Sequence, residues 1–244
     1  MAVYRQFDAL KFVAGLARQG SEFLFAPSDH RSLSLRRWLD GVVAKRSFDI
    51  CFSLGVLVLF SPLYLAIALI IKLTSPGPVF YVQRRVGKDF RPFGCIKFRT
   101  MVINADAVLE EMLRRSPELR AEFEQDFKLK KDPRITGIGH ILRLTSLDEF
   151  PQFWNVLKGD MSIVGPRPLV PKELYKYGRH IDKVLTIRPG LTGLWQVSGR
   201  NDIPYGTRVR MDSYYVHHRH WFMDLWIVCK TVFVMLFPKN NGAY

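Results

Sequence analysis

The longest hydrophobic stretch of the chain runs from residue 48 to residue 71, broken only by Asp49, Ser53, Ser61-Pro62 and small residues. As one straight helix it could cross the hydrocarbon core of a bilayer, which is about 30 Å thick. Proline, however, removes a backbone hydrogen bond and clashes with the preceding turn. A sharp bend at Ser61-Pro62 would leave two arms of about a dozen residues, each near 18 Å at about 1.5 Å per residue and too short to cross.

Basic residues flank this stretch on both sides. Those before it are Arg36, Arg37, Lys45 and Arg46, and those after it are Lys72, Arg84, Arg85, Lys88 and Arg91. Positive charge favours the cytoplasmic side of a membrane, so a re-entrant helix broken at Ser61 and Pro62 would satisfy both flanks by entering and leaving on one face. A single crossing with a proline kink is the alternative, because membrane-spanning helices tolerate proline.

Two strands are predicted next, at residues 79–83 and 93–98, on either side of a basic loop that contains glycine. Lys97 and Arg99 alternate with apolar neighbours, so both cations are expected on one face of the second strand. Two adjacent cations can clamp a diphosphate, although a solvated strand face would show the same pattern.

Several helices are predicted from periodicity, at residues 104–127 with an interruption at Ser116-Pro117, at 138–144, at 168–177 and in the aromatic tail 220–237. The tail could lie in a membrane interface or be buried as a core helix, since its length fits both. The N-terminal residues 1–40 suggest a short helix near residues 7–16, or a segment without fixed structure.

A pair of adjacent carboxylates, Asp148 and Glu149, begins one more predicted helix. The residues that recur at helical spacing and predict its buried face are Leu147, Phe150, Trp154 and Leu157. Asp148, Gln152 and Asn155 are expected on the opposite face, where a carboxylate could meet a ligand. Gly159 is expected to end the helix.

A structural interpretation of the acidic pair is available. Ser146-Leu-Asp-Glu149 fits a capping box, and acidic residues are favoured in a first helical turn. A cap does not account for Arg143 just before the pair, or for Arg167 in a Pro-Arg-Pro segment after the helix. These cations indicate that an anion binds nearby.

Residues 187–200 form a glycine-rich run that predicts a loop holding Arg188, Trp195, Gln196 and Arg200. Aromatic, amide and guanidinium groups together suit a nucleobase or a sugar, and a purely structural loop is the alternative. The sequence contains no Walker loop, no GxGxxG loop and no Cys/His cluster with metal-ligand spacing.

Lys and Arg outnumber Asp and Glu by 36 to 22, a net charge of +14, which favours an anionic partner such as nucleic acid, a phosphorylated substrate or a membrane surface. A nucleic-acid-binding module would explain the charge but neither the hydrophobic stretch nor the adjacent acids. A non-catalytic, membrane-anchored scaffold would explain the stretch and leave the basic cluster without a role.

Many motifs in order resemble one family. They lie between about residues 45 and 237 and comprise Lys45-Arg-Ser-Phe-Asp49, Ser61-Pro62, Lys97-Phe-Arg-Thr-Met101, Arg143-Leu-Thr-Ser-Leu-Asp-Glu149, the run from Asn155 to Pro168, Arg188-Pro-Gly-Leu-Thr-Gly193, Gln196-Val-Ser-Gly-Arg200 and Asp212-Ser-Tyr-Tyr-Val216. On these residues the chain resembles the bacterial sugar transferases, which are monotopic polyprenol-phosphate phosphoglycosyl transferases of exopolysaccharide and glycoconjugate synthesis. It looks most like the members with galactose- or glucose-1-phosphate donors.

The resemblance implies transfer of a sugar-1-phosphate from a UDP-sugar to undecaprenyl phosphate, with release of UMP. It implies that Asp148, beside Glu149, attacks the donor and forms a covalent phosphosugar intermediate, and that Mg²⁺ binds at these two carboxylates. The cations expected to bind the phosphates are Lys97, Arg99, Arg143 and Arg167. Asp224 also matches a functional carboxylate of the family, with a role that the residues alone do not reveal.

The expected fold is therefore α+β and mainly helical. An N-terminal extension (residues 1–40) would precede a re-entrant membrane helix hairpin (41–73) and a small cytoplasmic α/β catalytic domain with amphipathic interfacial helices (74–244). The expected location is the cytoplasmic face of a bacterial inner membrane, with lipid, UDP-sugar and undecaprenyl phosphate as partners and no nucleic acid. Neither a cleavable signal peptide nor a second membrane domain is predicted, and the sugar and homo-oligomerisation stay open.

Overall fold

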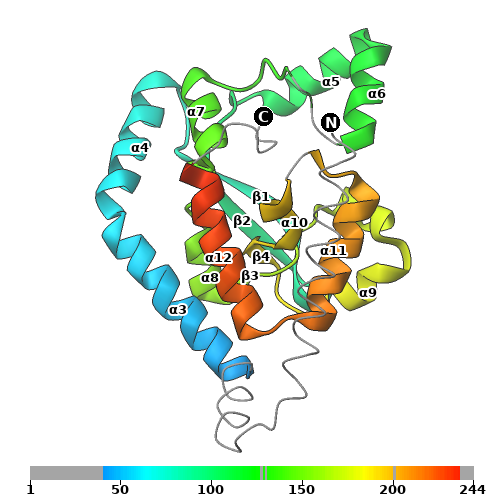
Figure 1. The fold of residues 1–244 in the computed structure, drawn as a ribbon. Coiled ribbons are helices and arrows are strands. Elements are labelled where there is room, and N and C mark those ends of the chain that lie inside the picture. Colours follow the sequence, from blue (N-terminus) through cyan, green and yellow to red (C-terminus); the bar gives the residue numbers. More distant parts are fainter. Residues whose placement is uncertain (1–40, 127–128, 130, 200–201, 237–244) are drawn as a thin grey trace, which may run out of the picture.

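The computed structural model describes residues 41–126, 129, 131–199 and 202–236 (Figure 1). The predicted extension 1–40 and Arg200 lie outside the described residues. The helices are α3 (Val42–Leu59), α4 (Ser61–Thr74), α5 (Ala105–Arg115), α6 (Pro117–Asp126), α7 (Gly137–Thr145), α8 (Gln152–Lys158), α9 (Ile181–Val184), α10 (Leu194–Ser198), α11 (Tyr205–His218) and α12 (Trp221–Leu236). The 3-10 helices are η1 (Lys88–Phe90), η2 (Leu147–Glu149) and η3 (Pro171–His180), and the strands are β1 (Phe80–Val86), β2 (Pro92–Phe98), β3 (Ser162–Val164) and β4 (Gly190–Thr192).

The hydrophobic stretch is broken where the sequence predicts it. Helices α3 and α4 meet at Phe60 and are bent by 61°. Pro62 lies in the first turn of α4, where its missing N–H would be unpaired in any helix. The Ser61 hydroxyl donates to the Val58 carbonyl at 2.9 Å and so satisfies one acceptor that the break leaves over.

None of the helices in the described part of the chain has by itself the length and apolar composition of a membrane span. Only α3 and α4 taken together, as a bent pair, meet both criteria. Each arm packs one face on the rest of the molecule and leaves the other face apolar and exposed. The large exposed side chains of the two arms include Val42, Val43, Leu54, Val58, Leu59, Leu65, Leu69 and Leu73.

The two predicted strands form the antiparallel hairpin β1–β2, and the first strand extends further than expected, to Val86. A second small sheet pairs β3 with β4 in parallel. The glycine-rich run was predicted as a loop, and this is wrong: it contains β4 and α10. The glycines instead permit close backbone contact, since a Cβ at Gly165 would lie 2.7 Å from the carbonyl oxygen of Arg188.

The helix after the acidic pair buries a different face from the one predicted. Trp154 is 54% exposed, whereas the polar residues Gln152 and Asn155 are buried. The cause is a break in phase, because η2 precedes Pro151 and α8 starts only afterwards. The Asn155 amide pairs with the edge of β2, accepting from Ile96 N at 3.0 Å and donating to the Gly94 carbonyl at 2.7 Å. The helix ends at Gly159, as predicted, with a φ of 94°.

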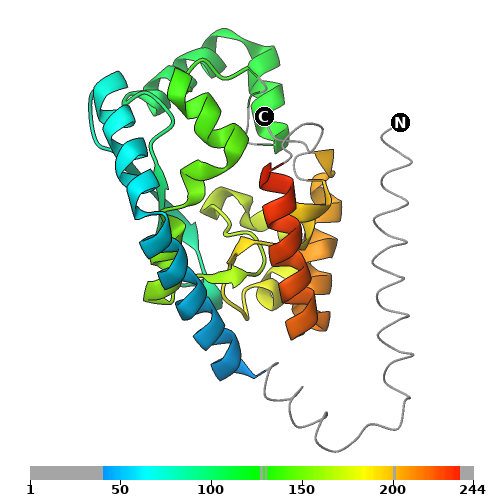
Figure 2. The ribbon, with the colours of Figure 1, turned by 60° about the vertical axis from the view of Figure 1, so that its left-hand side comes forward.

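The remaining predicted helices are found. The segment after Pro168 is helical, as predicted, and takes the 3-10 form η3, which is kinked at Gly178. The tail forms α12, which buries Met223 and Ile227 against the core and leaves Phe222 and Phe233 exposed, so it has both a core face and an open apolar face. Figure 2 shows α3–α4 and α12 on two sides of the small strands, which frame the site described next.

Candidate active site

The acidic pair sits on a tight corner between α7 and α8. Ser146 ends α7 in the left-handed conformation (φ 60°) and leads directly into η2, which carries both Asp148 and Glu149. The predicted capping box is not formed: no side-chain cap hydrogen bond occurs at this end, because Ser146 lacks the extended backbone of an N-cap. Glu149 reaches across to β2 instead of back to the cap.

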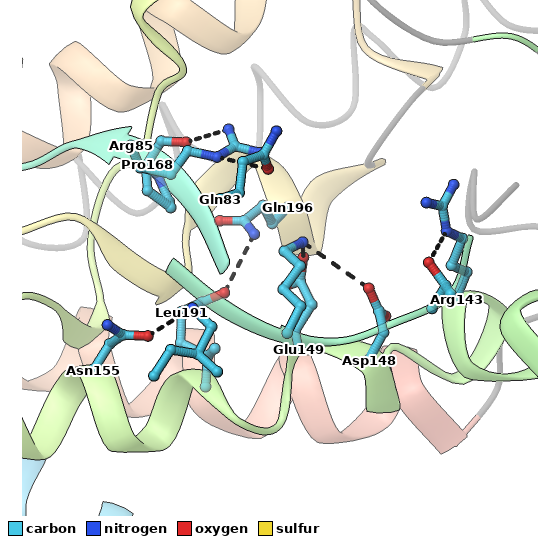
Figure 3. A network of polar contacts seen from close by, with 12 residues as sticks. Gln83, Arg85, Arg143, Asp148, Glu149, Asn155, Pro168, Leu191 and Gln196 are labelled. Carbon is cyan, nitrogen blue, oxygen red and sulfur yellow. Dashed lines mark hydrogen bonds and ion pairs between the residues drawn. The ribbon is translucent and has the colours of Figure 1, made fainter. Parts of the chain in front are cut away.

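One ammonium group is shared by the two acids. Lys97 Nζ lies 2.6 Å from Glu149 Oε1 and 4.0 Å from Asp148 Oδ2. Glu149 therefore holds the lysine in a charge-assisted hydrogen bond. Asp148 stays at the 4.0 Å limit of an ion pair with the same ammonium, and the charge of Arg143, also seen in Figure 3, acts on it as well. Lys97 therefore engages Glu149 closely and Asp148 only loosely.

The surroundings give Asp148 and Glu149 very different pKa values. Burial raises the pKa of Asp148 to about 6, and the charge of Glu149 adds to this, while Lys97 and Arg143 oppose it. Burial alone would also raise the pKa of Glu149, but Lys97 and Arg167 hold it well below its usual range, at about 2. Glu149 is thus a permanent anion paired with lysine, and Asp148 is the acid that titrates nearer neutrality.

Two predicted arginines complete this cluster. The Arg143 side chain donates from Nε to Thr100 Oγ1 at 2.9 Å, and its charge acts on Asp148. The charge of Arg167 acts on Glu149, and its guanidinium lies 5.8 Å from the centre of the Trp195 ring. All these charged groups line one cavity of about 1240 Å³.

Arg99 lies on the same cavity but has another task. It follows the last residue of β2, so it does not continue the strand's alternation. Its guanidinium donates to the carbonyls of Pro76 and Ser75, the latter at 2.8 Å, and thereby fixes the turn after α4. Lys97 and Arg99 nevertheless line the same cavity, and a contact of Arg99 with phosphate stays a prediction. The cations whose charges act on the acidic pair include Lys97, Arg143 and Arg167.

The residues suggested for a nucleobase or sugar do not stay together. Gln196 lines the main cavity and donates to the Leu191 carbonyl at 3.4 Å. Arg188 lies on a separate cavity of about 140 Å³, where it donates to the carbonyl of Gly159 at 2.8 Å and supports the end of α8.

Asp224 also lies on the smaller cavity, within a second charged cluster. Lys45 Nζ is 3.1 Å from Asp224 and 3.0 Å from Asp49. Each acid accepts a further hydrogen bond: Asp224 from the Tyr215 hydroxyl at 2.6 Å, on its other oxygen, and Asp49 from Ile163 N at 3.1 Å, on the same Oδ1 that meets Lys45. Asp224 thus ties α12 to α3 at a distance from the acidic pair.

Sequence reasoning missed Arg85, which was counted only as flanking charge. It is buried, donates to the Pro168 carbonyl at 2.9 Å and to Gln83 Oε1 at 2.6 Å, and lies 3.9 Å from Glu173 (Figure 3). These contacts fix the segment that carries Arg167. The signal available was strand alternation, because Arg84 and Arg85 cannot both face solvent on one strand.

Comparison with known proteins extends these observations. A family model described as bacterial sugar transferase matches residues 41–238. The undecaprenyl-phosphate galactose phosphotransferase of Salmonella typhimurium is 52% identical over 201 residues, which make up 82% of this chain and 41% of that protein. A UDP-galactose-lipid carrier transferase of Erwinia amylovora is 50% identical over 200 residues, with the same two coverages of 82% and 41%. The exopolysaccharide production protein ExoY of Rhizobium meliloti is 50% identical over 192 residues, 79% of this chain and 85% of ExoY.

The chain therefore spans about two fifths of the length of the Salmonella and Erwinia relatives and most of the length of ExoY. The family match covers α3–α4, the acidic pair and α12 alike. The chain belongs to the bacterial sugar transferase family.

Proposed function

We propose that the protein transfers a hexose-1-phosphate from a UDP-sugar to undecaprenyl phosphate and releases UMP, as the first membrane step of exopolysaccharide or glycoconjugate synthesis. The observation that carries the proposal is the acidic pair in its cation-lined cavity, where Glu149 binds Lys97 at 2.6 Å and the buried Asp148 lies 4.0 Å from the same ammonium. The names of the Erwinia and Salmonella relatives support galactose as the sugar, and a relative named for UDP-glucose, from Escherichia coli and 38% identical over 219 residues, supports glucose.

In the first step Asp148 attacks the phosphorus that bears the sugar. A carboxylate is a competent nucleophile toward phosphorus. A bond forms between an Asp148 oxygen and the sugar-bearing phosphorus, and the bond from that phosphorus to the bridging oxygen breaks. UMP leaves with the bridging oxygen. Lys97, Arg143 and Arg167 are positioned to stabilise the charge on the phosphates, the largest electrostatic demand of such a transfer.

In the second step the polyprenyl phosphate takes the sugar-phosphate from the enzyme. One of its phosphate oxygens attacks the same phosphorus, and the bond between phosphorus and Asp148 breaks. The aspartate is regenerated as a carboxylate, and the product is a polyprenyl diphosphate sugar. The first step needs Asp148 ionised, so its raised pKa sets a lower pH limit on turnover.

Magnesium fits this site only together with the donor. Among the described residues no group of three or more His, Cys, Asp and Glu side chains could hold a metal ion. Asp148 and Glu149 offer hard carboxylate oxygens, and Mg²⁺ often binds through one or two carboxylates plus substrate phosphates. When bound, the ion would neutralise phosphate charge. We expect isothermal titration to show clear Mg²⁺ binding with UDP present and little without it.

The bent pair α3–α4 is proposed to enter one leaflet and return, which leaves the acidic pair near the membrane surface. The exposed apolar side chains of both arms and the 61° bend support this arrangement. A cysteine in place of His30, in a background lacking Cys51, Cys95 and Cys229, reports the side on which the preceding chain lies. It should be protected from an impermeant thiol reagent on intact cells, and should become labelled when Ser61 and Pro62 are both changed to leucine. Labelling without those changes would replace the hairpin by a single crossing.

Activity itself is tested with membranes that contain the protein, undecaprenyl phosphate and UDP-galactose, UDP-glucose or their N-acetylated counterparts. UMP release that requires the protein supports the transfer. A donor labelled in its β-phosphate should leave label on the protein when the acceptor is omitted, and Asp148→Asn should abolish that label. If no donor releases UMP, the scaffold alternative gains support.

A further inference from the structure

The main cavity does not end at the charged cluster. Its lining continues from Asp148 and Glu149 into a groove with α3 on one side and α12 on the other. The side chains here are Phe52 and Val56 of α3, Val228, Val232 and Met235 of α12, and Ile163 of β3 between them. The lining of the cavity therefore includes an apolar wall from α3 and α12 besides the charged cluster. These side chains define the apolar groove, and Figure 2 shows the two helices that carry most of them, α3 in blue and α12 in red.

Polar contacts hold the two helices of the apolar groove in place. Helix α12 is tied to α3 at its N-terminal end by the Lys45–Asp224 ion pair of 3.1 Å. Farther along, the hydroxyls of Thr231 and Thr192 share a hydrogen bond of 2.7 Å, which joins α12 to β4. Beyond this point Val232 is 50% exposed although it lines the cavity, so the groove also opens outward.

The charged cluster and the apolar groove together restrict which ligand can fill the cavity. A molecule that fills the whole cavity needs an anionic head for Lys97 and Arg143 and an elongated apolar part attached directly to that head. The uridine and sugar of the donor are polar throughout and would leave their hydrogen-bonding groups unpaired between Val56, Val228 and Val232. The polyprenyl phosphate, whose first isoprene unit is bonded to the phosphate, has the required pattern.

We propose that the apolar groove binds the isoprene units nearest the phosphate of the lipid acceptor, and so aims that phosphate at Asp148. The proposal rests on the proposed function, because it takes polyprenyl phosphate as the acceptor. It adds a binding site for the acceptor's chain, formed by the facing sides of α3 and α12. The outward opening beside Val232 would let the rest of the chain pass into the bilayer.

A photoreactive acceptor tests the location in the unaltered protein. A polyprenyl phosphate with a diazirine on its first isoprene unit is irradiated with the protein in vesicles, and the labelled peptides are identified. Label is expected on α3 near Phe52 and on α12 near Val232 or Met235, and unlabelled polyprenyl phosphate should compete it away. Label on the outer face of α12, at Phe222 or Leu225, would overturn the proposal. Competition by plain phospholipid alone would assign the groove to an ordinary acyl chain and overturn it as well.

A matched pair of variants tests the consequence. Val232→Trp fills the groove, and Leu225→Trp adds the same bulk to an exposed position of α12 that does not line the cavity. Transfer to the acceptor, measured as kcat/KM, should fall by about tenfold or more in Val232→Trp, the effect of about 1.4 kcal/mol of lost acceptor binding. It should stay near wild type in Leu225→Trp.

Exchange of labelled UMP into UDP-sugar, measured without acceptor, separates the two proposals. It needs only the donor and Asp148, so Val232→Trp should retain exchange while it loses transfer. Equal loss of both reactions would show that Val232→Trp damages the fold or the donor site, and the photolabelling result would then decide the location. Absence of exchange and labelling of Asp148 in the wild type would refute the proposed function, whereas intact exchange with unimpaired transfer in Val232→Trp would refute the groove alone.

Discussion

Two clusters of this protein have the same composition, one lysine near two acids. They differ in how closely the lysine approaches each acid. In the cluster of Lys45, Asp49 and Asp224 the ammonium lies 3.0 and 3.1 Å from the two carboxylates. Each carboxylate also accepts a further hydrogen bond, from Ile163 N and from the Tyr215 hydroxyl.

In the other cluster Lys97 lies 2.6 Å from Glu149 but 4.0 Å from Asp148. The first arrangement joins α3, β3 and α12 through close contacts to both acids, whereas in the second the lysine binds one acid closely and the other only loosely. A buried acid that is closely paired stabilises structure, while burial of a loosely paired one raises its pKa, as it does for Asp148. The distance of each acid from its lysine, rather than residue type, therefore separates the anchoring cluster from the proposed reactive one.

The largest expected effect is on chemistry. Asp148→Asn removes the nucleophile and should lower turnover by about 10⁴-fold or more, the scale seen when a covalent catalyst is deleted. UMP release is the measurement, and Asp182→Asn, at an exposed position, is the control. Near-normal turnover in Asp148→Asn would transfer the nucleophilic role to Glu149 or to water.

The comparison is tested most directly by removing each lysine. Lys97→Met should lower turnover by about 10²- to 10³-fold, because the phosphates lose a cation that faces them. Lys45→Met should leave turnover per folded molecule within a few-fold, but should destabilise the protein by about 3 kcal/mol, since two buried acids lose their partner. Thermal unfolding in detergent and UMP release, measured on both variants, should give opposite rankings. Similar rankings would mean that the two clusters are not functionally distinct.

A smaller loss is expected when Arg167 keeps its charge but loses its planar fork. Arg167→Lys should lower kcat/KM by about tenfold to a hundredfold, because lysine cannot make two parallel bonds to a phosphate. Arg84→Lys, an exposed change on β1, is the control. Activity within a few-fold of wild type would leave Arg167 with only a general electrostatic role.

The dependence of kcat/KM on pH should follow the ionisation of Asp148. Because the pKa of Asp148 is about 6 and the nucleophile must be ionised, kcat/KM should fall about tenfold for each pH unit below 6. Above this pKa the profile should level off. Glu149, with a pKa near 2, stays ionised over the same range and should add nothing to the slope. A flat profile down to pH 5 would contradict the raised pKa of Asp148.

The smallest expected effect is on the free energy of unfolding of Asp148→Asn. This substitution should abolish activity but raise stability. Asp148 keeps its proton in the folded state up to about pH 6 and in the unfolded state only to about 3.8, so its contribution to stability declines as pH rises between these values. Asp148→Asn carries no charge to desolvate. It should be more stable than wild type at pH 7, on the order of 2 kcal/mol, and the gain should vanish below pH 4. A variant less stable at both pH values would count against the assignment.

The bend, the β1–β2 hairpin and the existence of most helices were predictable because each rests on local chemistry. Proline in the interior of an apolar stretch removes a hydrogen bond and favours a new helix start, and alternation marks a strand. The face of α8 was not predictable, since Pro151 and η2 reset the helical phase and place Trp154 outside. The glycine-rich run misled for a related reason: glycine marks close backbone contact as readily as it marks a loop.

The residues of the site were predictable from the sequence, but the pairing of their side chains was not. The sequence brings Asp148, Glu149, Lys97, Arg143 and Arg167 forward as candidates, and they do line one cavity. It could not show which acid binds the lysine, because a difference between 2.6 and 4.0 Å depends on side chains from β2 and η2. Nor could it show that Asp224 pairs with Lys45, which is distant in the chain.

The close approach of three glycines has a consequence for how this chain can vary. Gly165, Gly190 and Gly193 are buried and pack backbone against backbone next to the segment that carries Arg167, and a Cβ on any of them would meet main-chain atoms. No residue with a side chain fits there without moving the main chain. When the three glycines and Val232 are randomised and active variants are selected, glycine should return at all three positions, whereas the half-exposed Val232 should accept other apolar residues.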